Sequence, residues 1–110
     1  MPLSERARVE IYIPDQPVAA YQELLRTIVN EFTVSLGGCT VKHGLDGYYL
    51  SKFGQTIPDR ISIVYTDTPF DFQRNIVALS RYADKLRENA FEALREEAIL
   101  VAVLPVYHSD

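Results

Sequence analysis

The spacing of apolar residues changes along this chain between steps of two and steps of three or four, and the order of these changes limits the folds open to it. Over 8–13, apolar and polar residues alternate, which predicts a strand with one buried face. From 18 onward the apolar residues recur every three or four positions, which predicts an amphipathic helix. The same reasoning predicts these further elements: strands at 39–45 and 48–51, a strand at 61–66, a helix ending near 94, and a strand at 98–104.

The predicted order is β-α-β-β-α-β, in which two helices connect strands around a central hairpin. This is the split βαβ arrangement, and it predicts an α+β, ferredoxin-like fold with one antiparallel sheet and both helices on one face. The usual strand order of that fold places the first and third strands in the centre. The chain has 110 residues, so we expect residues 1–110 to form a single domain.

Residues that favour helix starts precede both predicted helices. Asp15 or Gln16 is the expected N-cap of the first helix, with Pro17 opening it. In the second, Thr68 is the expected cap, Pro69 the first helical residue, and the following aspartate a partner for the helix dipole.

The last predicted strand, AILVAVL, is apolar on both sides. Ile99 and Val101 point to one side of the strand, while Leu100 and Leu104 point to the other. The ferredoxin-like order makes this an edge strand with one face lacking a helix, and such a strand invites aggregation when exposed. A second copy, or the C-terminal segment 105–110, should therefore cover it. We expect a homo-oligomer, with a dimer packed sheet to sheet favoured because symmetric dimers are the commonest oligomers.

Charge and cysteine content narrow the class of protein. The formal net charge is −4 and the basic residues are scattered, which disfavours nucleic-acid binding. The single cysteine cannot form an internal disulfide and fits a reducing compartment. The N-terminal residues lack the apolar run of a signal peptide, and no apolar run reaches membrane-spanning length. We expect a cytosolic protein with no membrane partner.

The stretch GGCTVKHGLDGYY, at 37–49, is the densest in chemically active side chains. Cys39 and His43 lie four residues apart on one predicted strand, about 13 Å between Cα atoms, too far to share a zinc ion. Neither a phosphate-binding glycine loop nor a dinucleotide motif occurs. We therefore expect no metal site and no cofactor, and we interpret Cys39 as a small core residue.

Acid–base chemistry by His43 is the remaining catalytic hypothesis, because an imidazole titrates near neutral pH. Tyr48 and Tyr49 could assist it, and Asp46 could orient it or bind a polar ligand. Such a histidine can equally be a hydrogen-bonded interior residue.

A polar shelf is predicted on the face of the sheet opposite the helices. Tyr12, Lys42, Ser62 and Thr66 are its expected members, and Tyr12 and Lys42, together with Asp46, are candidate ligand-binding residues. If the shelf is covered by a second copy, the same side chains would form hydrogen bonds across the dimer.

The short motifs GGCTV, GLDGYY, DRISIVYTD and EEAILVAV occur in this order along the chain. This pattern resembles an uncharacterised, cyanobacterial-type family of small bacterial ferredoxin-like α+β proteins, over most of the chain. The resemblance implies the fold and carries no activity or site residue.

Two functions follow from these patterns. The first is a small cytosolic binding or regulatory module that self-associates through its sheet and can hold a small-molecule ligand. The alternative is an enzyme resembling the dimeric α+β barrel class, acting on a small organic molecule with His43 as the acid–base group.

Overall fold

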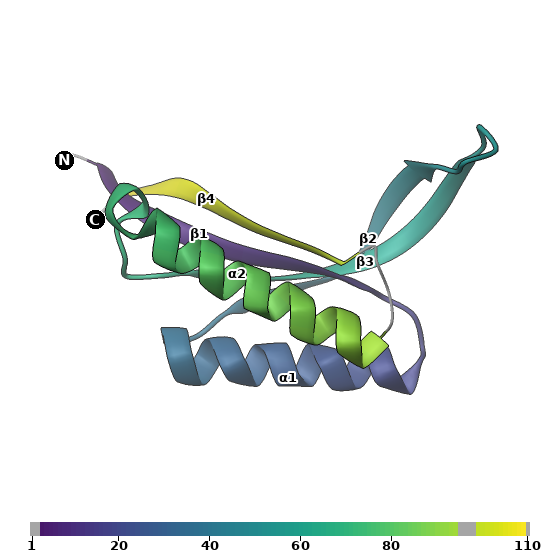
Figure 1. The fold of residues 1–110 in the computed structure, drawn as a ribbon, viewed down its shortest axis with the longest axis horizontal. Coiled ribbons are helices and arrows are strands. Elements are labelled where there is room, and N and C mark those ends of the chain that lie inside the picture. The colour runs from purple at the N-terminus through teal and green to yellow at the C-terminus, as the bar shows by residue number, and fades with distance from the viewer. Residues whose placement is uncertain (1–2, 95–98, 110) are drawn as a thin grey trace.

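A computed structural model of the chain describes residues 3–94 and 99–109. Its elements are β1 (Leu3–Pro14), α1 (Ala19–Leu36), β2 (Thr40–Leu50), β3 (Thr56–Asp67), α2 (Phe72–Leu94) and β4 (Leu100–Ser109). The strands form one antiparallel sheet in the order β2-β3-β1-β4, and both helices lie on one of its faces (Figure 1). The predicted ferredoxin-like fold is confirmed, with β1 and β3 in the centre of the sheet.

The core lies between the sheet and the helices, where the predicted apolar stripes meet. Val9, Ile11 and Ile13 of β1 are at most 1% exposed. The two helices add buried side chains at the predicted spacing: Leu24, Ile28, Phe32, Leu79, Leu86 and Ala90. Burying each large apolar side chain contributes about 1.5 to 3 kcal/mol before entropy is counted, so this layer holds both helices on the sheet.

The ends of α1 differ in how well the sequence predicted them. Gly37 follows the helix with φ +94°, and its N–H donates to the carbonyl of Thr33, so the glycine closes the helix as expected. At the other end the N-cap is Val18, which has no side-chain cap bond. The predicted cap at Asp15 or Gln16 is wrong, because the Asp15 carboxylate instead accepts a hydrogen bond from the N–H of Gly44.

The start of α2 also departs from prediction. The Asp71 carboxylate accepts the N–H of Arg74 at 2.9 Å, so Asp71 caps the helix and Pro69 lies before it. The predicted cap, Thr68, is fully buried. Its hydroxyl donates to the carbonyl of Ala7 at 2.8 Å, tying the β3–α2 connection to β1.

Three strands, β1, β3 and β4, extend beyond the ranges that the apolar pattern indicated, and β1 begins at Leu3 although its predicted start was residue 8. The β2–β3 pairing continues out to Leu50 opposite Thr56, so β3 also includes residues 56–60, which precede the predicted strand at 61–66. The strand β4 continues past Pro105 to Ser109, paired with β1 throughout. Residues 105–109 therefore extend the sheet and do not cover its open face. Ala98, the predicted first residue of the last strand, lies outside the described residues.

A bulge in β2 changes which face its side chains occupy. The register shifts between Lys42 and Leu45, so that Val41 pairs with Val64 while Leu45 pairs with Ile61. Because one extra unpaired residue reverses the alternation, Leu45 moves to the face opposite Val41. A regular strand over 39–45 would place both residues on one face, so the prediction of an uninterrupted strand there is wrong.

The predicted polar shelf keeps only two of its four members. Ser62 pairs with Ile13 and Thr66 pairs with Val9, so both lie beneath the helices and are nearly fully buried. Tyr12 pairs with Ile63 on the open face, and Lys42 is the β2 partner of the same residue.

The β2–β3 hairpin projects beyond the helical layer and bends away from it (Figure 1). The radius of gyration is 15.0 Å, compared with about 13 Å for a compact 100-residue domain. Large apolar side chains on the hairpin are exposed, including Leu50 and Phe53. No helix in the part of the chain that the structure describes is long and apolar enough to cross a membrane.

Candidate functional site

At the base of the hairpin, the N–H and the carbonyl of Gly44 in the β2 bulge both bond side chains of other segments. The Asp15 carboxylate accepts the Gly44 N–H at 2.6 Å, and Arg60 Nη2 donates to the Gly44 carbonyl at 3.3 Å. Gly44 has φ +64°, a left-handed conformation that favours glycine. The β1–α1 connection and β3 thus fix the point where β2 bends, which positions the residues that follow.

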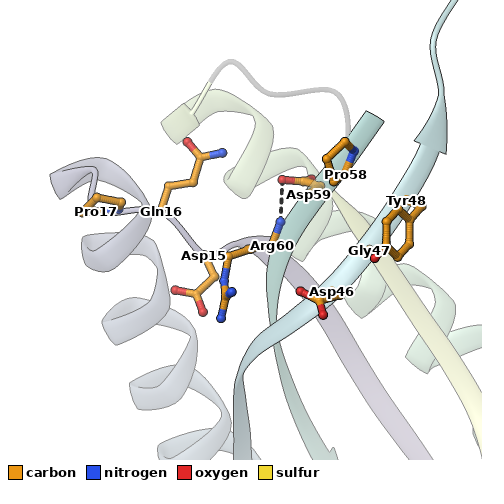
Figure 2. Close-up of a pocket in the computed structure, with 9 residues that line it drawn as sticks. All are labelled: Asp15, Gln16, Pro17, Asp46, Gly47, Tyr48, Pro58, Asp59 and Arg60. Carbon is orange, nitrogen blue, oxygen red and sulfur yellow. Dashed lines mark hydrogen bonds between the residues drawn. The ribbon is translucent and has the colours of Figure 1, made fainter. Parts of the chain in front are cut away.

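A hollow of about 410 Å³ opens beside this anchor, between the β1–α1 connection and the two hairpin strands (Figure 2). In the view of Figure 2, the Arg60 side chain stands between the carboxylates of Asp15 and Asp46. A third carboxylate belongs to Asp59, whose Oδ1 accepts the backbone N–H of Arg60 at 2.9 Å. The complete lining is Asp15, Gln16, Pro17, Asp46, Gly47, Tyr48, Pro58, Asp59 and Arg60.

A second, larger hollow of about 810 Å³ adjoins the first and has aromatic walls. The two hollows share Gln16, Gly47, Tyr48 and Asp59. We call the smaller one the acidic hollow and the larger one the aromatic hollow, and the two together the hairpin groove. The tyrosines of the larger hollow are Tyr12, Tyr21, Tyr48 and Tyr49.

Four of the six predicted site residues line the hairpin groove. Asp46 is in the acidic hollow, Tyr12 and Tyr49 are in the aromatic one, and Tyr48 lines both. The Tyr12 hydroxyl donates to the Glu10 carboxylate at 2.9 Å, and this hydrogen bond raises the pKa of Tyr12. Tyr48 and Tyr49 are 70% and 55% exposed, so their rings are accessible to a ligand.

The other two predicted residues lie elsewhere. Lys42 is exposed on the open face, with its Nζ 5.4 Å from the centre of the Tyr65 ring. His43 is exposed at the β2 edge, with Nδ1 3.3 Å from the Ser62 hydroxyl. It lines a separate hollow together with Val29 and Val41.

The structure therefore does not bring His43 and the tyrosines into one of the described hollows. An acid–base role for His43 with Tyr48 or Tyr49 stays a prediction. Cys39 is half-buried, with its Sγ 4.0 Å from the Val29 carbonyl. Among the described residues, no three cysteine, histidine or carboxylate side chains are grouped so as to hold a metal ion.

A charged network crosses the open face at the end of the sheet away from the hairpin groove. Arg8 donates to both carboxylate oxygens of Asp67, with the Nη2–Oδ2 contact at 3.0 Å, and its guanidinium lies 4.2 Å from the centre of the Tyr65 ring. The hydrogen bond from Arg8 lowers the pKa of Asp67. His108 Nε2 lies 3.3 Å from Asp67 Oδ2, which links β4 to the same carboxylate.

Sequence reasoning missed several groove residues, notably Asp15, Tyr21, Asp59 and Arg60. The sequence predicts Asp15 as a helix cap, and Asp59 and Arg60 precede the predicted strand at 61–66. The alternation of Ile57, Asp59 and Ile61 with Pro58 and Arg60 was the available signal for a longer strand. It was masked by Pro58, which disfavours a strand interior.

Comparison with known proteins supports the fold alone. No family model and no curated protein sequence matches this chain. Among solved structures, the divalent cation tolerance protein CutA1 from Thermus thermophilus is similar, with a TM-score of 0.61 and 17% identity over 97% of this chain and 88% of that one. A phage SAM lyase in its apo state gives a TM-score of 0.62 and 10% identity, over 96% and 86%.

A third similar structure is CPII from Thiomonas intermedia K12, a nitrogen regulatory PII-like protein bound to ADP, AMP and bicarbonate. Its TM-score is 0.54 at 15% identity, covering 99% of this chain and all of that one. At these identities the likeness extends to the fold and not to ligands or activity. The chain is thus similar in fold to small ferredoxin-like proteins with differing functions.

Proposed function

We propose that this protein is a small cytosolic regulatory module that binds a small organic molecule in the hairpin groove and works as a homo-oligomer. The observation that carries the ligand part is the convergence of Asp46, Tyr12, Tyr48 and Tyr49 on one groove. Concave sites of about 300 to 1,000 Å³ that combine apolar walls with a few polar groups are typical of small-molecule binding. The similar Thiomonas protein, by its description, is a regulatory protein that holds small ligands.

The self-association part is supported by apolar surface that the subunit leaves uncovered. Leu100 is 51% exposed on the open face and Phe53 is 81% exposed at the hairpin. A two-stranded hairpin without further packing is at best marginally stable in water, so the projecting β2–β3 arm favours contact with another copy. A homodimer is the smallest closed arrangement that can cover both surfaces.

Ligand binding can be tested with tryptophol, a neutral indole alcohol small enough for the groove. Addition of tryptophol should shift the backbone amide signals of Gly47 and Tyr48 in a saturable way, while those of α2 stay in place. The proposal fails if neither tryptophol nor its charged analogues shift these amides at up to about 10 mM, the weak end of measurable affinities.

The assembly surface can be tested with a matched pair of variants. Leu100→Glu places a charge on the open face and is expected to shift the protein toward monomer. Val77→Glu places the same charge on α2, where Val77 is 62% exposed, and should leave the assembly intact. Equal masses for the two variants and the parent would show that the open face is not the contact surface.

A further inference from the structure

The two halves of the hairpin groove differ in chemistry. The acidic hollow carries the carboxylates of Asp15, Asp46 and Asp59 and a single cation, Arg60. Three negative groups and one positive group give a formal charge of −2 for its ionisable lining. The adjoining hollow is walled by tyrosines, Ile61 and Leu100.

The one cation of this lining is already engaged by the protein. Arg60 Nη2 donates to the Gly44 carbonyl, and a Cβ built on Gly44 would lie 2.8 Å from that nitrogen, which shows how closely the guanidinium packs on the bulge. A phosphate or carboxylate entering the groove would therefore meet a guanidinium already engaged with the Gly44 carbonyl, next to three aspartates. Three carboxylates lining one hollow make the entry of a further negative charge unfavourable.

A positively charged ligand meets favourable groups in both halves. Aspartate carboxylates can accept hydrogen bonds from an ammonium group, and such charge-assisted bonds are stronger than neutral ones. The faces of tyrosine rings attract cations through the negative side of their quadrupole. Tyr48, which lines both hollows, stands where the charged head and the apolar body of one molecule would meet.

We propose that the hairpin groove is selective for organic cations, an amine or quaternary ammonium group carried on an apolar or aromatic body. This rests on the proposed function of the groove as a ligand site and specifies the class of ligand. It sets the groove apart from the similar Thiomonas protein, whose described ligands, ADP, AMP and bicarbonate, are anions.

Three probes with one ring system and different charge separate the two proposals. Tryptamine is a cation at pH 7, tryptophol is neutral and indole-3-acetate is an anion. Titrations followed by the amides of Gly47, Tyr48 and Arg60 should show tryptamine binding at least tenfold more tightly than indole-3-acetate, with tryptophol between them. The preference should shrink as salt is raised, because screening weakens exposed charge interactions.

Isosteric variants locate the source of the selectivity. Asp46→Asn combined with Asp59→Asn removes two charges and keeps the side-chain shape, including the oxygen that accepts the Arg60 N–H. It should weaken tryptamine several-fold and leave tryptophol unchanged. Asp84→Asn, at an exposed position on α2, is the matched control and should change neither.

The outcomes distinguish the two proposals. Binding of indole-3-acetate as tight as that of tryptamine would overturn the cation selectivity and leave the ligand groove standing. A charge preference that survives the double variant would also overturn it, since the carboxylates would not be its cause. Absence of binding by all three probes would overturn the ligand groove itself.

Discussion

Gly44 is the residue on which the shape of the hairpin base depends most directly. Its N–H and its carbonyl are both taken by side chains from other segments, Asp15 and Arg60, and its φ of +64° is strained for other residues. The bulge that it forms reverses the alternation of β2, so that side chains from Leu45 onward lie on the opposite face from the one that a regular strand would give them.

Gly44→Ala is expected to lower the free energy of unfolding by about 1 to 2 kcal/mol, because alanine is strained in this backbone conformation and its Cβ would crowd Arg60. Gly47→Ala is the control, since its Cβ would meet only ordinary contacts of 3.8 Å or more. Urea unfolding of both variants measures the difference. Equal stabilities for the two variants would contradict the role given to Gly44.

Asp67 supplies a pH-dependent contribution to stability. The pKa of Asp67 is lowered in the folded state, mainly by the hydrogen bond from Arg8. The folded state therefore stabilises the ionised carboxylate more than the unfolded chain does. The stabilisation is therefore present above the ordinary pKa of 3.8 and is lost as the pH falls through the lower folded value. Asp67→Asn should cost about 1 to 3 kcal/mol at pH 7.

The stability difference between the parent and Asp67→Asn should begin to shrink as the pH falls through the ordinary pKa of 3.8, and it should vanish only below the lower folded value, where the carboxylate is protonated in both states. Denaturant unfolding of both proteins at pH values from about 7 down to about 3 provides the test. A stability difference that stays constant over this range would show that the charge of Asp67 contributes nothing.

At the scale of single residues, the sequence predicts which kinds of side chain line the groove better than it predicts which of them lie close together. Asp46, Tyr12, Tyr48 and Tyr49 were identified by chemical type, and all four line it. His43 was grouped with them because it is close in sequence, but the bulge and the bend at Gly44 separate it from them. Such a bend depends on Asp15, 29 residues away, so local pattern could not reveal it.

Among the elements, the connection from β3 to α2 is fastened to β1 by Thr68. Its hydroxyl donates to the Ala7 carbonyl and accepts the Phe70 N–H, and it is fully buried. Thr68→Val would keep the shape and remove both hydrogen bonds of the hydroxyl, while the Ala7 carbonyl keeps the backbone N–H of Thr68. The loss of two hydrogen bonds should lower the free energy of unfolding by about 1 to 3 kcal/mol.

Thr33→Val is the matched control for Thr68→Val. Thr33 is exposed on α1 and its hydroxyl bonds only its own helix, through the Val29 carbonyl. Its replacement should change stability by no more than about 0.5 kcal/mol, as for most surface positions. If both valine variants are equally stable by thermal unfolding, the bond across to β1 is not what fastens α2.

One tyrosine of α2, Tyr82, buries its hydroxyl group. The Tyr82 hydroxyl is buried and has no hydrogen-bond partner in the described part of the chain. Burial, followed by the charge of Glu31, raises the pKa of Tyr82 to about 12. Tyr82→Phe should therefore leave the free energy of unfolding unchanged or raise it, and a loss of more than about 1 kcal/mol in urea would be evidence of a water-mediated partner.

The type and order of the elements are predictable from the sequence because the apolar periodicity is strong. The positions at which the elements begin and end are not. Helix α1 was expected to start with a side-chain cap, yet Asp15 is used by β2 instead. The strand β4 continues through Pro105 as an edge strand, where a missing N–H can be tolerated. Tertiary demands of this kind decide the ends of elements and do not appear in local periodicity.

In the whole molecule, the open sheet face and the projecting hairpin both leave large apolar side chains exposed. The helices cover one side of the sheet, and the apolar residues of β4 on the other side stay partly exposed. Charge on that face is largely paired within the subunit, as with Arg8 and Asp67. A face that combines apolar patches with internally satisfied charges is suited to contact with another copy.

The most direct test is the molar mass of the protein at micromolar concentration, measured by light scattering behind a sizing column. Self-association through the open face predicts a whole-number multiple of the 12.5 kDa subunit mass, and a dimer is the favoured value. A mass of one subunit across the concentration range would contradict it.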